Sequence, residues 1–549
     1  MNDIQEILKN YIKESIRFCF HNDSLLDLVS VEIPRDTKIA DYSTNIAMKS
    51  SKILHDNPVN IANIIVKDLK TRIKEAENIE VLGPGFINFK IKKNYLASII
   101  NEIIKLDDNY GRNNSGNNEK VLVEYVSANP TGDLHLGHAR GAAWGDSVTR
   151  LYNFSGYDCL REYYINDAGN QIEMLGKSLL SRYYDCFNKK YPLPDEGYHG
   201  QDVIDIAKEI ASKEGDKYLY LNENDALKYF KELGIEYELD KIKRDLNYFR
   251  VEFDSWIHEK MFYENDNKRI KDCLKSMNDL GLTYYNDGAL WFKTTLYGDD
   301  KDRVLIKKDG SYTYLTPDIA NHVYKLQRGY TKLVDLWGAD HHGYVLRMNS
   351  ALEALGYPKG TLEVDLEQMV RLVEDGVEVK MSKRTGNAIT LRELCDDVGV
   401  DAARYIFVSH EVGSHLDFDL NIARLKNNEN PVYYAQYAYA RMASILKESK
   451  IELKEEYTLL TNEKELDLLK IIGDFTNVVI DASKTRGPNK ICNYIQKLST
   501  NFHSYYASCK INDENNIELS KERLALIKAI SITLKNSFNL IGVEALEKM

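Results

Sequence analysis

The sequence lacks the features that mark several classes of protein. Its 549 residues include only 10 prolines and 31 glycines, and 43% are hydrophobic, which excludes a collagen-like or disordered chain. It contains no run of about 18 uncharged apolar residues, and its N-terminus has no apolar segment followed by a cleavage site. We therefore expect no membrane span and a cytoplasmic location. The length predicts roughly three or four domains.

Cysteine pairs and an excess of positive charge are also missing. The seven cysteines form no close Cys-x-x-Cys pair, so we expect reduced, mostly buried thiols and neither a disulfide frame nor a zinc site. Acidic residues outnumber basic ones by 84 to 72, giving a formal net charge of −12. That balance excludes a polybasic coat for nucleic acid or anionic lipid, so any nucleic-acid site must be local.

An apolar segment at 121–126 is the first strand of a predicted parallel sheet. A loop and a helical pattern to about Phe154 follow it, and this order of elements is typical of an open parallel α/β fold. Further apolar runs at 332–337 and 403–408 predict that the sheet resumes there. A charged, tyrosine-rich stretch lies before them, and we interpret about 183–290 as insertions.

The two ends of the chain are predicted to be separate domains. Residues 1–92 combine helical patterns with a closing strand, 93–120 form a helix and an Asn- and Gly-rich linker, and 431–549 are almost purely helical. The expected fold class is α/β. A Rossmann-like parallel-sheet domain over 121–430 is flanked by an α+β N-terminal domain and an all-α C-terminal bundle.

Two histidines stand where the loop after the first strand becomes a helix. His135 and His138 flank Gly137, and small residues in the following turn let a ligand approach the helix N-terminus. The N–H groups and dipole there attract phosphate. The two imidazoles can donate hydrogen bonds to phosphate oxygens and stabilise the charge that develops in phosphoryl or nucleotidyl transfer. The alternative is two surface histidines beside a glycine cap.

A second segment, KMSKRTGN at 380–387, clusters Lys380, Lys383 and Arg384 on one loop. Such a loop can fold over a polyphosphate and balance its charge as the leaving group departs. The alternative is a solvated basic turn. Because both segments lie beside an apolar strand although about 240 residues separate them, we expect two halves of one nucleotide-binding sheet.

HLGH at 135–138 and KMSKR at 380–384 resemble the paired HIGH and KMSKS signatures of class I aminoacyl-tRNA synthetases. The surrounding segments are similar to those of arginyl-tRNA synthetases: VEYVSANPTGDLHLGHARGAAWGD, REYYINDAGNQI, YLTPDIA, WGADHHGY, KMSKRTGN and NPVYYAQYAYAR. Similar segments run from GPGFINF to the closing GVEALEKM, and the resemblance is weakest at about 183–290 and 450–480. Leu136 and Arg384 depart mildly from the signatures.

The resemblance implies ATP-dependent ligation of L-arginine to its cognate tRNA through arginyl-adenylate, with attack by the terminal ribose 2′-hydroxyl. It implies that His135 and His138 stabilise the reacting phosphate and that Lys380 and Lys383 stabilise the leaving pyrophosphate. The expected ATP-binding residues are His135, Gly137, His138, Met381, Ser382 and Lys383. Mg²⁺ is expected with ATP, although no dense cluster of carboxylates is visible. The expected partners are L-arginine, ATP and the tRNA specific for arginine, and the chain is expected to be a monomer.

Glu124 is the one charged residue in the apolar strand VLVEYV, so its carboxylate needs a cationic partner. A substrate guanidinium and an internal Arg or Lys are both open as that partner. The resemblance adds Tyr314, Asp318 and Asn129 to an arginine pocket, and His342 with its neighbours Asp340 and His341 near the adenosine or amino acid. For Asp318 a blander alternative exists, in which Thr316 caps a helix, Pro317 follows and Asp318 stabilises the dipole.

The C-terminal part differs from the rest in charge and in aromatic content. Residues 431–549 contain 16 basic and 15 acidic side chains, so the acidity lies in the first 430 residues. Aromatic and cationic residues alternate in PVYYAQYAYAR and NFHSYYASCK, an arrangement suited to stacking unpaired bases. The alternative is that these tyrosines belong to the core. The resemblance assigns this domain to the anticodon loop and residues 1–92 to the outer corner of the tRNA.

Two other functions stay open from the sequence. A small-molecule nucleotidylyltransferase shares the histidine loop and the basic loop but does not explain the helical C-terminal domain. A catalytically silent tRNA-binding paralogue explains that domain, but its signature residues would be expected to have drifted.

Overall fold

A parallel sheet of five strands forms the centre of the computed structural model, which describes residues 4–34, 39–379, 389–447, 449 and 451–549. The strands are β4 (Lys120–Glu124), β5 (Asp158–Ile165), β6 (Ser255–His258), β10 (Lys332–Gly338) and β11 (Leu362–Glu367). They lie in the order β11-β10-β4-β5-β6, and every neighbouring pair is parallel. The strand order reverses between β4 and β10, and ligands bind at the carboxyl ends of the strands beside such a point.

Both faces of the sheet are covered, as an all-parallel sheet requires. Val121 and Val123 of β4 pack in one apolar cluster with α6 (Leu136–Phe154), whereas Leu122 packs in another with α11 (Leu315–Gln327) and α12 (His342–Ala354). This explains why β4 is a continuous apolar run until Glu124.

Two sequence predictions within this domain were wrong. The apolar run at 403–408 belongs to a helix, α14 (Val400–Val408), because a short apolar segment does not distinguish a strand from a buried helix. Strand β6 lies inside the stretch interpreted as insertions, yet it forms an edge of the central sheet. The strands predicted at 121–126 and 332–337 are confirmed as β4 and β10.

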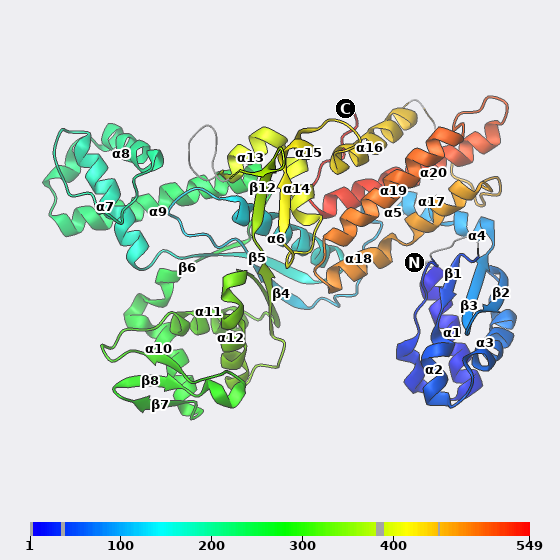
Figure 1. Cartoon of the computed structure of the whole chain (residues 1–549), viewed down its shortest axis with the longest axis horizontal. Coiled ribbons are helices and arrows are strands. Elements are labelled where there is room, and N and C mark those ends of the chain that lie inside the picture. The colour runs from blue at the N-terminus through cyan, green and yellow to red at the C-terminus, as the bar shows by residue number, and fades with distance from the viewer. Residues whose placement is uncertain (1–3, 35–38, 380–388, 448, 450) are drawn as a thin grey trace.

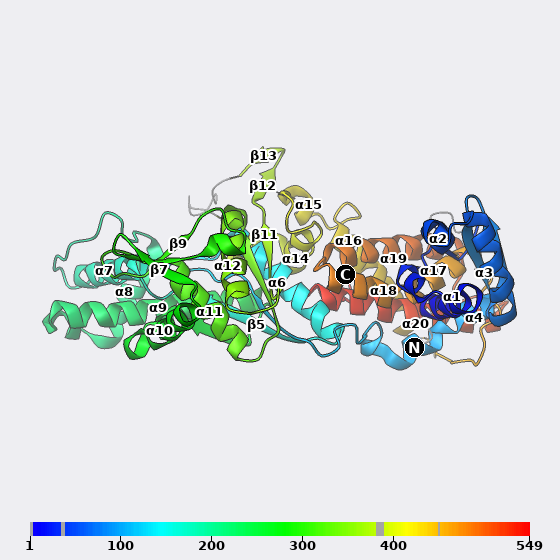
Figure 2. The ribbon, with the colours of Figure 1, turned by 90° about the horizontal axis from the view of Figure 1, so that it is seen from below.

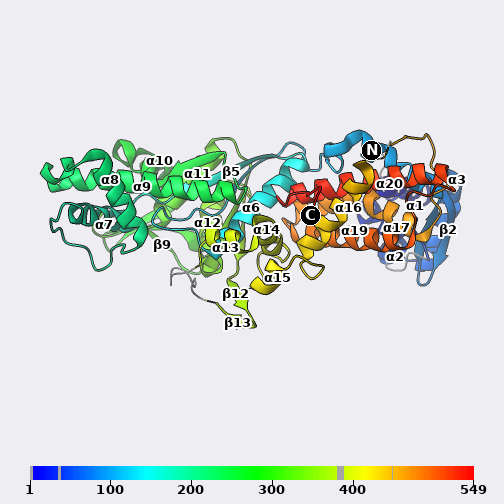
Figure 3. The same ribbon diagram turned by 90° about the horizontal axis from the view of Figure 1, so that it is seen from above.

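Helical insertions extend the central domain at the end far from the bundle (Figure 3). Helices α7 (Asn170–Asp185), α8 (Gln201–Glu214) and α9 (Glu223–Tyr248) enclose their own apolar cluster around Tyr183 and Phe230. A second group follows β6 and contains α10 (Glu264–Asp279) and an antiparallel sheet of β7 (Thr283–Asn286), β8 (Ala289–Phe292) and β9 (Arg303–Ile306).

The ends of the chain form the α+β and all-α parts that the sequence predicts. Helices α1 (Ile4–Phe20), α2 (Ile46–Leu54) and α3 (Pro58–Arg72) pack on a sheet of β1 (Tyr42–Thr44), β2 (Ala76–Leu82) and β3 (Phe86–Ile91). Helices α4 (Lys93–Ala97) and α5 (Ile99–Leu106) lead to the centre. The bundle comprises α16 (Pro431–Lys447), α17 (Glu463–Gly473), α18 (Phe475–Lys484), α19 (Asn489–Ser508) and α20 (Ile517–Leu540).

The molecule is elongated, and the N-terminal part lies against the bundle at one end of it (Figures 1 and 2). The ammonium of Lys470 is 3.3 Å from a carboxylate oxygen of Asp41, and both side chains are buried. The amide of Gln5 donates to Asp474 over 2.6 Å. These contacts join the first and last parts of the sequence.

Besides α14, five elements of the described chain lie between β11 and the bundle in the sequence. They are β12 (Val370–Glu374), β13 (Val377–Glu378), β14 (Leu416–Asp419), α13 (Leu391–Val398) and α15 (Leu420–Arg424). All seven cysteines are free thiols, as predicted. Among the helices of the described ranges, none is long and apolar enough to span a membrane.

Candidate active site

Polar side chains collect at the carboxyl ends of the central strands. Glu124 ends β4, Glu367 ends β11, and Glu259 directly follows β6. Because the strands are parallel, residues that are far apart in the sequence reach one edge of the sheet. His135 and His138 of the first signature follow β4 at this edge as well.

The paired histidines cap helix α6. Nδ1 of His135 accepts a hydrogen bond from the amide of Gly137 over 3.2 Å, and Nδ1 of His138 accepts one from the amide of His135 over 3.3 Å. The rings stack with centroids 3.7 Å apart. Because each Nδ1 accepts, the neutral tautomer carries its proton on Nε2, so each ring is able to donate to a phosphate oxygen.

Desolvation favours the neutral form of both imidazoles. It lowers the pKa of His138 to about 3, with a further contribution from the charge of His135, and it lowers the pKa of His135 as well. The helix-cap alternative and the phosphate-binding prediction are therefore compatible. Capping uses Nδ1 of each ring, and the Nε2–H group is the donor for a phosphate oxygen.

The flank of the second signature lies directly on the first. The amide of Leu391 donates to the carbonyl of Leu134 over 2.7 Å, and Thr390 pairs with His135 in an isolated antiparallel bridge. This contact supports the expectation that two halves of one site are separated by insertions. The signature residues themselves lie outside the described residues: Lys380, Met381, Ser382, Lys383 and Arg384.

A cavity of about 510 Å³ opens beside the histidines. Its lining consists of Val126, His135, Gly137, His138, Gly141, Leu336, Gly338, Ala339, Asp340, Glu367, Gln368, Met369 and His415. Three of the predicted ATP-binding residues thus share one cavity, and small residues make room in it. The volume is in the range of small-molecule and cofactor sites.

Glu124 has an internal partner. The ammonium of Lys325, on α11, lies 2.6 Å from Oε2 of Glu124 and 3.1 Å from Oδ1 of Asp335. Burial favours the neutral amine, but the two carboxylates outweigh this effect and raise the pKa of Lys325. Of the two partners that the sequence leaves open for Glu124, the structure contains the internal lysine.

A second cavity, of about 640 Å³, contains two of the residues predicted to bind arginine. Asn129 and Tyr314 line it together with Glu259, Tyr263 and Gln171. The amide of Asn129 donates to Gln171 over 2.7 Å, and Tyr314 is 88% exposed at the rim.

Glu259 was missed by the sequence analysis. Its side chain is buried and accepts a hydrogen bond from Tyr263 over 3.1 Å. Burial raises its pKa to about 7, and the charges of Asp318 and Asp167 act in the same direction. The signal was present, since an acidic residue directly follows the strand SWIH, but that strand fell within the presumed insertions.

Asp318 lies close enough to Glu259 for its charge to act on the Glu259 carboxyl group. The hydroxyl of Tyr344 donates to its carboxylate over 2.5 Å, and burial raises its pKa. The helix-cap alternative holds only in part. Asp318 lies in the first turn of α11, but the N-cap is Tyr314, and the Thr316 hydroxyl donates to the carbonyl of Leu305 over 2.7 Å.

The histidines after β10 take different positions. His342 is exposed in the first turn of α12. The ring centroid of His341 lies 6.5 Å from that of Tyr344, and its charge influences the Asp318 carboxyl. His341 is therefore the better placed of the two, while the role of His342 stays a prediction.

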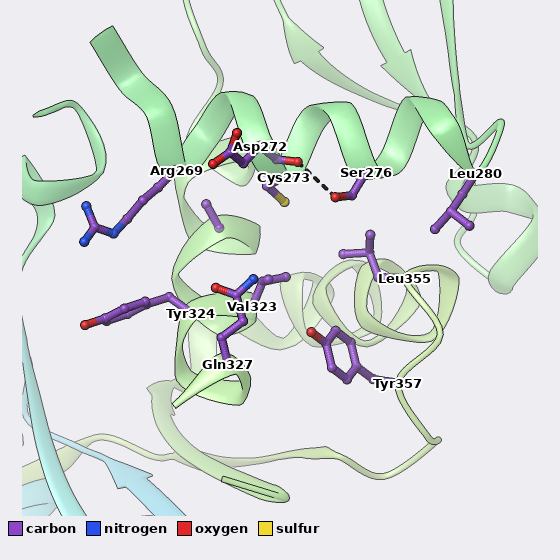
Figure 4. Close-up of a pocket in the computed structure, with 11 residues that line it drawn as sticks. Arg269, Asp272, Cys273, Ser276, Leu280, Val323, Tyr324, Gln327, Leu355 and Tyr357 are labelled. Atoms are coloured by element: carbon purple, nitrogen blue, oxygen red, sulfur yellow. Dashed lines mark hydrogen bonds between the residues drawn. The ribbon is translucent and has the colours of Figure 1, made fainter. Parts of the chain in front are cut away.

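A separate pocket between α10, α11 and the end of α12 holds none of the predicted residues (Figure 4). Arg269, Asp272 and Tyr324 line it, and the Ser276 hydroxyl donates to the carbonyl of Asp272 over 3.0 Å. Burial raises the pKa of Cys273 to about 12, so its thiol is not a nucleophile near neutral pH. In the described part of the chain, no three His, Cys, Asp or Glu residues are grouped to hold a metal ion.

The tyrosines of the bundle divide between core and surface. Tyr505 is fully buried and Tyr439 nearly so, as the core alternative predicts. Tyr437 and Tyr506 are exposed, and the guanidinium of Arg441 lies 4.6 Å from both ring centroids. This exposed group has the composition of a base-stacking surface.

Three family models match the chain and together span nearly all of it. Residues 2–91 match the arginyl-tRNA synthetase N-terminal domain, 99–460 the class I tRNA synthetase (R) catalytic domain, and 435–549 the DALR anticodon-binding domain.

Full-length relatives share about half of the sequence. The curated arginine–tRNA ligase of Bacillus licheniformis is 47% identical over 555 residues, which cover 100% of each chain. That of Geobacillus thermodenitrificans is 48% identical over 553 residues and 99% of each chain. The solved Thermus thermophilus arginyl-tRNA synthetase is similar in fold, with a TM-score of 0.76 over 100% of both chains at 19% identity.

Proposed function

The chain belongs to the arginyl-tRNA synthetase family, and we propose how its residues bind and activate the substrates. It is an arginine–tRNA ligase, which uses ATP to join L-arginine to tRNA. The full-length similarity does not favour a silent paralogue or a small-molecule nucleotidylyltransferase.

The observation that carries the mechanism is a contact beside the first signature: Thr390 and Leu391, which follow the second signature in the sequence, pair with His135 and Leu134. ATP binds in the cavity beside His135 and His138. When the arginine carboxylate attacks the α-phosphate, Nε2–H groups of the two histidines donate to its oxygens and stabilise the added negative charge. Lys380 and Lys383 balance the charge of the leaving pyrophosphate. The terminal ribose 2′-hydroxyl of tRNA then takes the arginyl group.

The arginine side chain binds in the neighbouring cavity. Its guanidinium is held by the carboxylates of Asp318 and Glu259, since planar cations are recognised best by paired acceptors. Tyr314 closes the rim and Asn129 contacts the amino-acid end. Glu124, at the carboxyl end of β4, contributes to the arginine site, with Lys325 balancing its charge.

Mg²⁺ enters with ATP. Protein sites for this ion commonly use one or two carboxylates together with substrate phosphates, so the grouped ligands of a resident metal site are not needed. The proposed location is the cytoplasm and the proposed oligomeric state is a monomer. Light scattering of the purified chain tests the oligomeric state.

The proposed domains are 1–92 for the outer corner of the tRNA, 93–120 as a helix and linker, 121–430 for catalysis and 431–549 for the anticodon loop. The exposed group of Tyr437, Arg441 and Tyr506 supports the last assignment, because aromatic and cationic side chains suit unpaired bases.

The decisive experiment is aminoacylation of bulk tRNA with each proteinogenic amino acid in turn. Charging is expected with arginine alone and only in the presence of ATP. Charging with another amino acid would refute the assigned pocket. RNA-independent exchange of pyrophosphate with no amino-acid requirement would favour a nucleotidylyltransferase, and binding of tRNA without charging would favour a silent paralogue.

A further inference from the structure

The cavity beside the signature histidines has an unusual carboxyl group in its wall. Much of the lining is small or apolar, and these residues are Val126, Gly137, Gly141, Leu336, Gly338, Ala339 and Met369. Such a lining suits the flat faces of a heteroaromatic ring. Glu367, at the carboxyl end of β11, stands among them.

The Glu367 carboxyl has a buried oxygen that the described protein leaves without a hydrogen bond. Oε1 is excluded from solvent, and no donor among the described residues reaches it. A Cβ atom on Gly141 would stand 2.9 Å from Oε2, so the glycine lets the carboxyl group pack against α6. A buried polar atom without a partner is costly, which points to a donor supplied by the ligand.

The nearest cation does not neutralise this carboxyl group. Arg140 donates to the carbonyls of Gln368 and Glu411, over 2.9 and 2.8 Å, and no ion pair of Glu367 occurs within the described ranges. An ionised Glu367 would repel the phosphates of ATP. The uncharged base is therefore the part of the nucleotide that fits beside it.

We propose that Glu367 is a specificity-determining residue that binds the edge of the adenine ring. Its carbonyl oxygen accepts a hydrogen bond from the 6-amino group, and its hydroxyl donates to the adjacent ring nitrogen. A protonated carboxyl offers one donor and one acceptor, which matches this edge, whereas a carboxylate only accepts. The inference rests on the proposed placement of ATP beside His135 and His138.

The required protonation state is available near neutral pH. Burial raises the pKa of Glu367 to about 8, against the opposing effects of the Arg140 charge and of the Gly141 backbone amide. The other titratable groups of the cavity are His135 and His138 of α6, Asp340 after β10 and His415 before β14. Because the protonated form binds, the affinity for ATP should fall about tenfold between pH 7 and pH 9.

Calorimetric titration of the full chain with ATP and Mg²⁺ at pH 7, 8 and 9 tests this proposal. The wild type should lose about tenfold in affinity across the range. Glu367→Gln keeps one donor and one acceptor without titrating, so its affinity should stay within about twofold at every pH. Glu353→Gln, on α12 outside the cavity, is the matched control and should keep the wild-type slope.

Purine riboside triphosphate, which lacks the 6-amino group, tests the contact itself. It should bind the wild type about tenfold more weakly than ATP, and Glu367→Ala should bind the two nucleotides equally. Melting curves of each variant establish that it is folded.

The outcomes separate this inference from the proposed arginine site. A flat ATP profile in the wild type, or a wild-type slope in Glu367→Gln, would overturn the Glu367 assignment even if arginine is charged normally. The expected slope in a chain that charges no arginine would support Glu367 and overturn the arginine site alone.

Discussion

The ammonium of Lys325 lies 2.6 Å from the carboxylate of Glu124, at the carboxyl end of the central strand β4; Lys325 is fully buried and the Glu124 side chain is 12% exposed. Glu124 is flanked in register by Asp335 on β10 and Glu162 on β5, so three carboxylates stand side by side. Lys325 also pairs with Asp335, while Arg328 pairs with Glu162 over 2.5 Å. Lys325 of α11 and Arg328, directly after this helix, thus supply the cations that make the acidic row tolerable.

Lys325→Met should strongly destabilise the chain, because it leaves buried carboxylates without their cation. The expected loss in the free energy of unfolding is about 3–5 kcal/mol. Urea denaturation measures it. Lys268→Met, which removes an exposed pair with Asp272, is the control and should change little. An unchanged midpoint for Lys325→Met would show that the acidic row does not need this cation.

His138→Ala should lower kcat for arginylation by about 10²–10³, the usual effect of losing one donor to a developing oxyanion. His138→Asn should recover part of the rate, since its amide also donates. Initial rates at saturating substrates measure both. Equal rates for Ala and Asn would argue that only the cap of α6 matters.

The low pKa of His138 leads to a prediction for the pH dependence of kcat. Desolvation lowers the pKa of His138 to about 3 and also lowers that of His135, so kcat should not depend on protonation of His138 between pH 6 and pH 8. Titration of the imidazole signals by NMR checks this. A His138 signal that titrates near its ordinary pKa of about 6.5 would contradict the assigned environment.

Asp318→Asn should raise the KM for arginine by about 30-fold or more, because it removes one member of a buried charge pair with the substrate. Relative use of citrulline, the neutral analogue, should increase. Asp272→Asn, in the separate pocket of Figure 4, is the matched control and should leave the KM unchanged. An unaltered preference for arginine in Asp318→Asn would contradict the pocket assignment, and Asp318 would then only stabilise the first turn of α11.

The raised pKa of Glu259 predicts that the affinity for arginine increases as the pH rises. Its pKa is about 7 in the free protein, and the ionised form is the one that binds a guanidinium. The dissociation constant for arginine should therefore fall about tenfold between pH 6 and pH 8. Glu259→Gln should bind weakly and without this slope. The slope is opposite in sign to the one expected for ATP, so the two ligands distinguish the two carboxyl groups.

Arg441→Ala should weaken the use of tRNA without affecting arginine. Loss of a stacking cation from the group of Tyr437 and Tyr506 is expected to raise the KM for tRNA by about tenfold, at roughly 1–3 kcal/mol per stacked base. Tyr285→Ala, which removes an exposed aromatic side chain on β7 outside the bundle, is the control. An equal effect of both variants would point to a general loss of stability and would contradict a specific role of Arg441.

The sequence by itself determined the first strand, the helix that His135 and His138 cap, and the all-helical C-terminal domain. These features depend on local signals: an apolar run, a glycine-rich helix start and helical periodicity. Local signals also explain the errors. The run at 403–408 is apolar because α14 is buried, and β6 was overlooked because four residues between long helices give little pattern.

Only the tertiary structure decided which charges meet. The sequence establishes that Glu124 needs a cation, but Lys325 lies about 200 residues away on a helix whose position depends on the sheet order. Glu259 and Glu367 likewise reach the site only because the strands are parallel, so that the C-terminal ends of β6 and β11 lie at one edge of the sheet. Burial, which shifts the pKa of both groups, is a property of the packed chain and is absent from the order of its residues.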